Sequence, residues 1–180
     1  IVFTAYEFTN GDKNSAAIYS DDGGRTWKRG KSVSGLSSEA VVTEADGKLY
    51  MFTRHGGYYV SNDWGKTWSG RKDMGINYNL GCQLTAVTYP EKIDGKTAIL
   101  FAAPSNTTTR AAGKIFVGLV QEDGTLKWTY DYSINGSDYY AYSCLTVLPD
   151  GTVGLLYENG ATEIKYIDLD IKDIAKGAAI

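Results

Sequence analysis

The sequence predicts an all-β domain assembled from repeated units of about forty residues. Three observations point to this class: short apolar strands separated by turns, a turn motif that recurs at a fixed interval, and very little helical periodicity. The chain has 180 residues, of which 21 are glycine and only 3 are proline. It is long enough to bury one sizeable core, and it has the glycines that many tight turns require.

Strand–turn–strand patterns follow one another along the chain. Residues 41–53 read as two strands joined by an Asp46-Gly47 turn, and residues 145–157 repeat the device around Asp150-Gly151. Further strands are expected at 16–20, 97–103 and 114–120. Only the stretch from about 171 to 179 favours a short helix, and no linker divides the chain.

The turn motif Ser-x-Asp-x-Gly-x-Thr-Trp begins at Ser20 and again at Ser61, 41 residues later. A decayed third copy at 123–128 keeps the spacing between Asp and Trp. In such a turn the carboxylate accepts hydrogen bonds from backbone N–H groups, glycine supplies a positive φ, and the tryptophan ring buries apolar area. The interval is close to the roughly 40–50 residues of one propeller blade, so the chain corresponds to about four blades.

Composition excludes several classes of function. The net charge of −3 provides no basic field to attract nucleic acid, and no apolar run is long enough for a membrane span. One histidine, His55, and two cysteines without CxxC spacing argue against a metal centre and against Ser-His-Asp catalysis. No cofactor is expected. The 14 tyrosines suit a sugar-binding site, although tyrosine also serves strands.

The repeated motif resembles the Asp box, which is known from sialidases and from several unrelated propellers. Similarity to sialidases extends over most of the chain, through residues 37–54, 103–115 and 141–158. The resemblance implies a six-bladed sialidase-type β-propeller. Residues 1–180 would be the C-terminal part of that domain, with its N-terminal blades, one clamp arginine and the aspartate general acid absent.

The resemblance also implies roles for individual residues. Tyr142 matches the catalytic nucleophile and Glu39 its partner. Arg54 and Arg110 match two of the arginines that hold the substrate carboxylate, and Glu158 matches a glutamate that braces a further clamp arginine. Weaker matches in the pocket are Tyr78 and Gln83.

The chemistry accounts for these residue types. Sialic acid carries a carboxylate on its anomeric carbon, which would repel the carboxylate nucleophile of most retaining glycosidases, and a neutral tyrosine avoids this repulsion. A phenol has an ordinary pKa of about 10, so it needs a base such as Glu39. The planar fork of arginine pairs with a carboxylate through two hydrogen bonds. The expected activity is that of an exo-α-sialidase, with retention through a covalent tyrosyl intermediate.

Other activities fit parts of the pattern. A trans-sialidase would use the same residues, whereas a non-catalytic sialoglycan-binding or structural propeller would need no Tyr–Glu couple. Sialic-acid-bearing glycans are the expected partners, and the resemblance implies a secreted or cell-surface protein. Without the missing clamp arginine and general acid, these 180 residues alone are expected to be inactive. Because an open propeller exposes edge strands, they are also expected to associate with an N-terminal fragment or with themselves.

Overall fold

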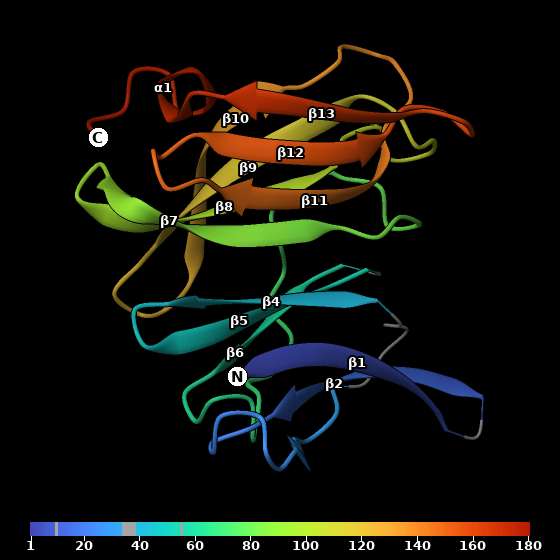
Figure 1. Cartoon of the computed structure of the whole chain (residues 1–180), viewed down its shortest axis with the longest axis vertical. Helices are drawn as coiled ribbons and strands as arrows, with labels where there is room; N and C mark the ends of the chain where they lie inside the picture. The colour runs from blue at the N-terminus through green and yellow to red at the C-terminus, as the bar shows by residue number, and fades with distance from the viewer. Residues whose placement is uncertain (10, 34–38, 55) are drawn as a thin grey trace. The chain divides into compact units, whose positions relative to one another are not determined.

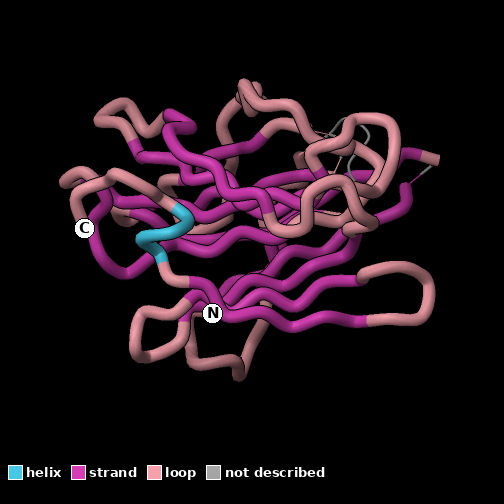
Figure 2. Tube along the Cα trace, turned by 90° about the horizontal axis from the view of Figure 1, so that it is seen from above, coloured by secondary structure: helices cyan, strands magenta, loops and turns pink. Residues whose placement is uncertain are grey.

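A computed structural model describes residues 1–9, 11–33, 39–54 and 56–180 (Figure 1). His55 and the pair Ser37-Ser38 lie outside these ranges. The described chain forms four antiparallel sheets in sequence order and one short helix, so that strands dominate the trace in Figure 2. It divides into two compact units, Ile1–Met74 and Gly75–Ile180, each with two sheets. The all-β prediction and the estimate of about four blades are confirmed.

The first unit contains two three-stranded meanders. Their strands are β1 (Val2–Thr9), β2 (Asp12–Tyr19) and β3 (Lys28–Arg29), then β4 (Ala40–Ala45), β5 (Lys48–Thr53) and β6 (Tyr58–Ser61). The predicted hairpin joins β4 to β5, where Asp46 and Gly47 have φ values of 50° and 73°. Two successive residues with positive φ are what a type I′ turn needs, so Asp-Gly sets the register of this hairpin.

The second unit contains a four-stranded and a three-stranded sheet. The strands are β7 (Thr85–Ile93), β8 (Lys96–Pro104), β9 (Gly113–Val120) and β10 (Leu126–Ser133), then β11 (Ala141–Val147), β12 (Val153–Glu158) and β13 (Ile164–Leu169). Leu100 and Val117 from the first sheet share one core with Leu145 and Leu155 from the second. β8 is buried on both faces beyond its first residue, which explains its unbroken apolar run.

Helix α1 (Ile171–Ile174) is shorter than the predicted 171–179. Its start agrees with the sequence, because Asp170 caps it by accepting the N–H of Lys172 at 2.8 Å. Its end differs because Ala175 already leaves the helical conformation, with φ −110° and ψ 56°, and Gly177 beyond it has a left-handed φ of 89°. Only Ile171, Ile174 and Ala175 are buried in this segment, so packing stabilises a single turn.

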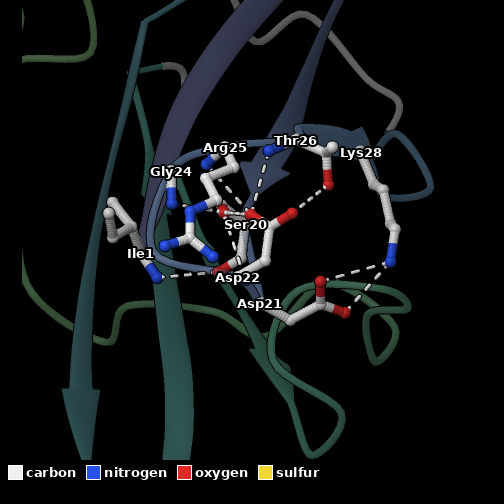
Figure 3. A network of polar contacts seen from close by, with 8 residues as sticks. All are labelled: Ile1, Ser20, Asp21, Asp22, Gly24, Arg25, Thr26 and Lys28. Atoms are coloured by element: carbon white, nitrogen blue, oxygen red, sulfur yellow. Dashed lines mark hydrogen bonds and ion pairs between the residues drawn. The ribbon is translucent and has the colours of Figure 1, made fainter.

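The two Asp boxes have nearly the same hydrogen bonds. In the first, drawn in Figure 3, Asp22 Oδ1 accepts the N–H of Thr26 at 2.9 Å and Oδ2 accepts its hydroxyl at 2.6 Å, while Ser20 Oγ accepts the N–H of Gly24 at 2.8 Å. In the second, Asp63 accepts the N–H of Thr67 at 2.8 Å and also its hydroxyl. The motif is therefore a self-supporting turn, as predicted.

The decayed third copy lies at the corresponding place, between β9 and β10, but has a different hydrogen bond pattern. Asp123 Oδ1 accepts the N–H of Thr125, two residues ahead rather than four, at 2.9 Å. The tryptophan still packs on a glycine, since a Cβ added to Gly118 would lie 2.9 Å from the Trp128 ring. Gln121 and Lys127 stand where the motif has serine and threonine, so the copy retains the packing and loses the box geometry.

The Asp boxes should make stability depend on pH. Hydrogen bonds from the hydroxyl and the amide of Thr67 lower the pKa of Asp63 from 3.8 to about 2, and Thr26 lowers the pKa of Asp22 in the same way. Because the folded carboxyl has the lower pKa, its stabilisation is complete above about pH 4 and is lost as the pH falls through about 2. We expect Asp63→Asn to lower the melting temperature of the complete protein by about 1–3 °C at pH 7.

The same variant provides its own control. As the pH falls to about 2 the wild-type carboxyl becomes protonated, so the difference in melting temperature between wild type and Asp63→Asn should shrink. Calorimetry at pH 7, 4 and 2 measures this difference directly. A difference of equal size at pH 7 and pH 2 would show that the charge of Asp63 does not stabilise the turn.

Candidate functional site

The structure places the candidate site residues in two groups. Glu39 and Arg54 belong to the first unit. The second unit holds the others: Tyr78, Gln83, Arg110, Tyr142 and Glu158. Each group forms contacts of its own, which are described separately below.

Glu39 and Arg54 form an ion pair at the open end of the β4–β5 hairpin. Arg54 Nη1 lies 2.9 Å from Glu39 Oε2, and the backbone N–H of Arg54 donates to the carbonyl of Glu39, also at 2.9 Å. The two side chains are only 19% and 30% exposed. The pair joins a carboxylate that can accept a proton to a guanidinium that can hold an anion.

Hairpin register explains why these two residues meet. Ala40 pairs with Thr53, so the residues just outside this rung face one another. Glu39 precedes Asp46 by seven positions, and Arg54 follows Gly47 by seven. The ion pair was not predicted, although this symmetry about an Asp-Gly turn is a signal that could have indicated it.

Arg110 and Tyr142 form the contact that defines the second group. The guanidinium carbon of Arg110 lies 4.9 Å from the centroid of the Tyr142 ring, a cation–π arrangement. An isolated bridge between Ala111 and Tyr139, with the N–H of Tyr140 donating to the carbonyl of Arg110 at 3.0 Å, ties the arginine loop to the start of β11. A positive group is therefore held directly beside a half-buried phenol.

Tyr142 occupies an irregular position in its strand. Ala141 pairs with Glu158 and Ser143 with Tyr157, so the β11–β12 register shifts at Tyr142 and leaves it outside the ladder. Its φ of 29° is strained for an aromatic residue, and such conformations gather at functional sites. Glu158 ends β12 beside this bulge.

The neighbouring Tyr140, unlike the half-buried Tyr142, has no access to solvent. Its side chain is fully buried, its ring stacks on Tyr157 with centroids 4.9 Å apart, and burial raises the pKa of its phenol. A phenol that neither reaches solvent nor ionises readily is unsuited to nucleophilic attack. Of these two tyrosines, only Tyr142 is accessible.

The weaker candidates Tyr78 and Gln83 are held by different kinds of contact, ring packing for Tyr78 and hydrogen bonds for Gln83. Tyr78 is buried, with its ring edge-on to Phe101 at 5.3 Å. Gln83 immediately precedes Leu84 and β7, and its side-chain amide bonds to the backbone of Ser143 in β11. The sequence suggested only a packing role for Cys82 at this place, but its sulfur accepts a hydrogen bond from the N–H of Tyr142 at 3.4 Å.

One pocket of about 350 Å³ in the second unit lies away from these residues. It is lined by the Asp150-Gly151 turn, Asp168 and the start of α1, and by none of the candidates. The turn joins the far end of β11 to β12, whereas Tyr142 lies at the near end. Contacts and backbone strain, rather than this pocket, mark the candidate site.

Within the described ranges, no group of three or more His, Cys, Asp or Glu side chains could hold a metal ion. In the same ranges, no helix has the length and apolar character needed to cross a bilayer.

Residues 1–158 match the family described as BNR repeat-like domain. The chain belongs to this family. Among curated relatives, the BNR-repeat domain is 37% identical to the anhydrosialidase of Macrobdella decora over 185 residues, covering 91% of this chain and 24% of that protein. It is 34% identical to sialidase B of Streptococcus pneumoniae, covering 98% of this chain and 28% of that protein. The domain thus spans about a quarter of the length of these relatives.

Solved structures agree with this assignment. The domain matches the NanB sialidase in complex with optactamide at a TM-score of 0.81 and 34% identity, over 95% of this chain and 29% of that chain. It matches the leech intramolecular trans-sialidase, complexed with 2,7-anhydro-Neu5Ac, at 0.78 and 31%, over 91% and 29%. The predicted resemblance to sialidases and the sialidase-type propeller fold are both confirmed.

Proposed function

We propose that the complete protein is an exo-α-sialidase that hydrolyses terminal sialic acid from glycoconjugates. The observation that carries this proposal is the Arg110 guanidinium held over the ring of Tyr142 at a strained bulge. It combines a nucleophile with an anion-binding group, the pairing that a substrate with a carboxylate on its anomeric carbon requires. The sialidases among its relatives support the same function.

Four of the candidates have roles in the proposed reaction. The Tyr142 oxygen attacks the anomeric carbon as the bond to the leaving oxygen breaks, and Glu39 accepts the phenolic proton. Arg54 and Arg110 hold the substrate carboxylate through charge-assisted hydrogen bonds. Water then attacks the same carbon and releases the phenolate, which regains its proton from Glu39, and sialic acid forms with retained configuration. The leaving oxygen takes its proton from a general acid that these candidates do not include, and the conjugate base of that acid later accepts the proton of the attacking water.

A second activity is favoured by particular relatives. The leech neighbour is an intramolecular trans-sialidase found with 2,7-anhydro-Neu5Ac, and a Ruminococcus gnavus neighbour at 30% identity is named as the same kind of enzyme. Applied to this protein, such a reaction would have a hydroxyl of the bound sugar, instead of water, attack the carbon linked to Tyr142. We propose intramolecular transfer as the alternative to hydrolysis, with Tyr142 as the nucleophile in both reactions.

Product analysis tests both activities. The complete protein is incubated with 3′-sialyllactose, and the released sugar is identified by mass spectrometry. Hydrolysis gives sialic acid, and intramolecular transfer gives an anhydro sugar lighter by one water. Binding of the glycan without release of either product would contradict the proposal and favour a sialoglycan-binding propeller.

Since its substrates are displayed outside cells, we also propose that the protein is secreted or held at the cell surface.

Arg110 should determine substrate affinity. Replacing it with lysine keeps the charge but removes the planar fork, and we expect KM to rise about tenfold, the effect of one charge-assisted hydrogen bond. Steady-state kinetics on an aryl α-sialoside measures this change. Arg29→Lys, at an exposed ion pair with Glu7, is the matched control and should leave KM unchanged. An unaltered KM in Arg110→Lys would remove this residue from the clamp.

A further inference from the structure

We propose that Gln83, together with Cys82, is a positioning residue for Tyr142. The two side chains hold the strained bulge of β11 from the neighbouring chain segment, and so fix the phenol beside Arg110. This inference rests on the proposed function, because it takes Tyr142 to be the nucleophile.

Gln83 bonds to Ser143 as the backbone of a strand would. Its Oε1 accepts the N–H of Ser143 at 3.0 Å, and its Nε2 donates to the carbonyl of Ser143 at 3.3 Å. The same Nε2 donates to the carbonyl of Leu84 at 2.6 Å, so both donors and the acceptor of the amide are engaged. β7 and β11 are edge strands of different sheets, and Gln83, two residues before β7, links the start of that strand to β11 through its side chain.

Cys82 secures the bulge itself. Tyr142 pairs with no residue of β12, and its N–H donates instead to Cys82 Sγ at 3.4 Å, a normal length for a bond to sulfur. The cysteine is 1% exposed, so this contact is shielded from water. A backbone at positive φ persists only where its surroundings hold it, and Cys82 and Gln83 hold the two successive amides of Tyr142 and Ser143.

The same segment also holds Arg110. The carbonyl of Gly81 accepts Arg110 Nη2 at 3.1 Å, and the N–H of Gly81 donates to Asn79 Oδ1 at 2.8 Å. Asn79 Nδ2 donates to the carbonyl of Thr109 at 2.9 Å, next to the arginine. Residues 79–83 therefore contact both partners of the cation–π pair, and they set its geometry from one side.

A neighbouring contact offers a matched control. The hydroxyl of Thr85 accepts the N–H of Leu145 at 3.1 Å, which links the same two strands. This bond lies further along β11 from Tyr142 and touches neither the bulge nor Arg110. If the side chains between β7 and β11 served stability alone, removing either link would have the same kinetic effect.

The experiment compares Gln83→Met, which keeps the length of the side chain without its amide, with Thr85→Val in the complete protein. For an aryl α-sialoside, we expect Gln83→Met to lower kcat about 10- to 100-fold with KM changed less than about twofold, since a displaced nucleophile affects the transition state most. Thr85→Val should keep the wild-type kcat. In Gln83→Glu, kcat relative to wild type should rise as the pH falls, because protonation of that carboxylate restores one donor.

The other outcomes are also decisive. Equal losses of kcat in Gln83→Met and Thr85→Val, or a raised KM with unchanged kcat in Gln83→Met, would overturn the positioning role. If the wild-type protein turns over no sialoside, the proposed function fails. Amide hydrogen exchange then tests whether the Gln83 side chain holds the backbone at the bulge. Faster exchange at Tyr142 and Ser143 in Gln83→Met, but only at Leu145 in Thr85→Val, would support it, and unchanged exchange at both residues would refute it.

Discussion

Tyr142→Phe should lower kcat of the complete protein on an aryl α-sialoside by at least about 10³-fold, because it removes the oxygen that we propose forms the covalent intermediate. The affinity for a sialic acid ligand should change little. Phenylalanine keeps the aromatic ring, so the guanidinium of Arg110 retains the face that it contacts at 4.9 Å. The substitution thus separates the chemistry of the phenol from its packing, which alanine would not do.

Tyr132→Phe is the matched control. It removes a phenolic oxygen from another half-buried tyrosine of the same unit, on β10, and should leave kcat and ligand affinity unchanged. Kinetics, ligand titration and circular dichroism of both variants measure the effect and confirm that they fold. Turnover at the wild-type rate in Tyr142→Phe would rule out a tyrosyl intermediate at this residue.

Glu39→Gln should lower kcat by about 10²- to 10³-fold, the usual effect of losing a general base. An amide cannot accept the phenolic proton, and Arg54 loses the carboxylate that lies 2.9 Å away. The melting temperature should fall by no more than a few degrees, since a partly exposed ion pair stabilises a protein weakly. A large kinetic effect with a small thermal effect is the signature of a catalytic rather than a structural carboxylate.

Glu44→Gln gives the same change of charge further along β4, where the carboxylate accepts the N–H of Gly47. It should keep the wild-type kcat. Glu39→Asp, which retains the charge but shortens the side chain, should recover part of the activity lost in Glu39→Gln. If Glu39→Gln and Glu44→Gln lowered kcat equally, the base would have to be another residue.

Local chemistry in the sequence was sufficient to predict much of the fold. The Ser-x-Asp-x-Gly-x-Thr-Trp boxes and the Asp46-Gly47 hairpin depend on contacts within a few residues. Their conformations can therefore be predicted from short segments of the sequence. The helix at the C-terminus was predicted in place but too long, because the backbone leaves the helical conformation at Ala175.

Describing the candidate site required both the sequence and the tertiary structure. The sequence by itself determined the all-β class and the blade-like repeats, and through resemblance it predicted Glu39, Arg54, Arg110 and Tyr142 as site residues. Only the tertiary structure decided that Tyr142 leaves the β11 ladder and that Gln83, 60 residues before Ser143, holds the bulge. The physical reason is that such contacts join the edges of two sheets, whose alignment follows from packing of the whole core and not from any local pattern.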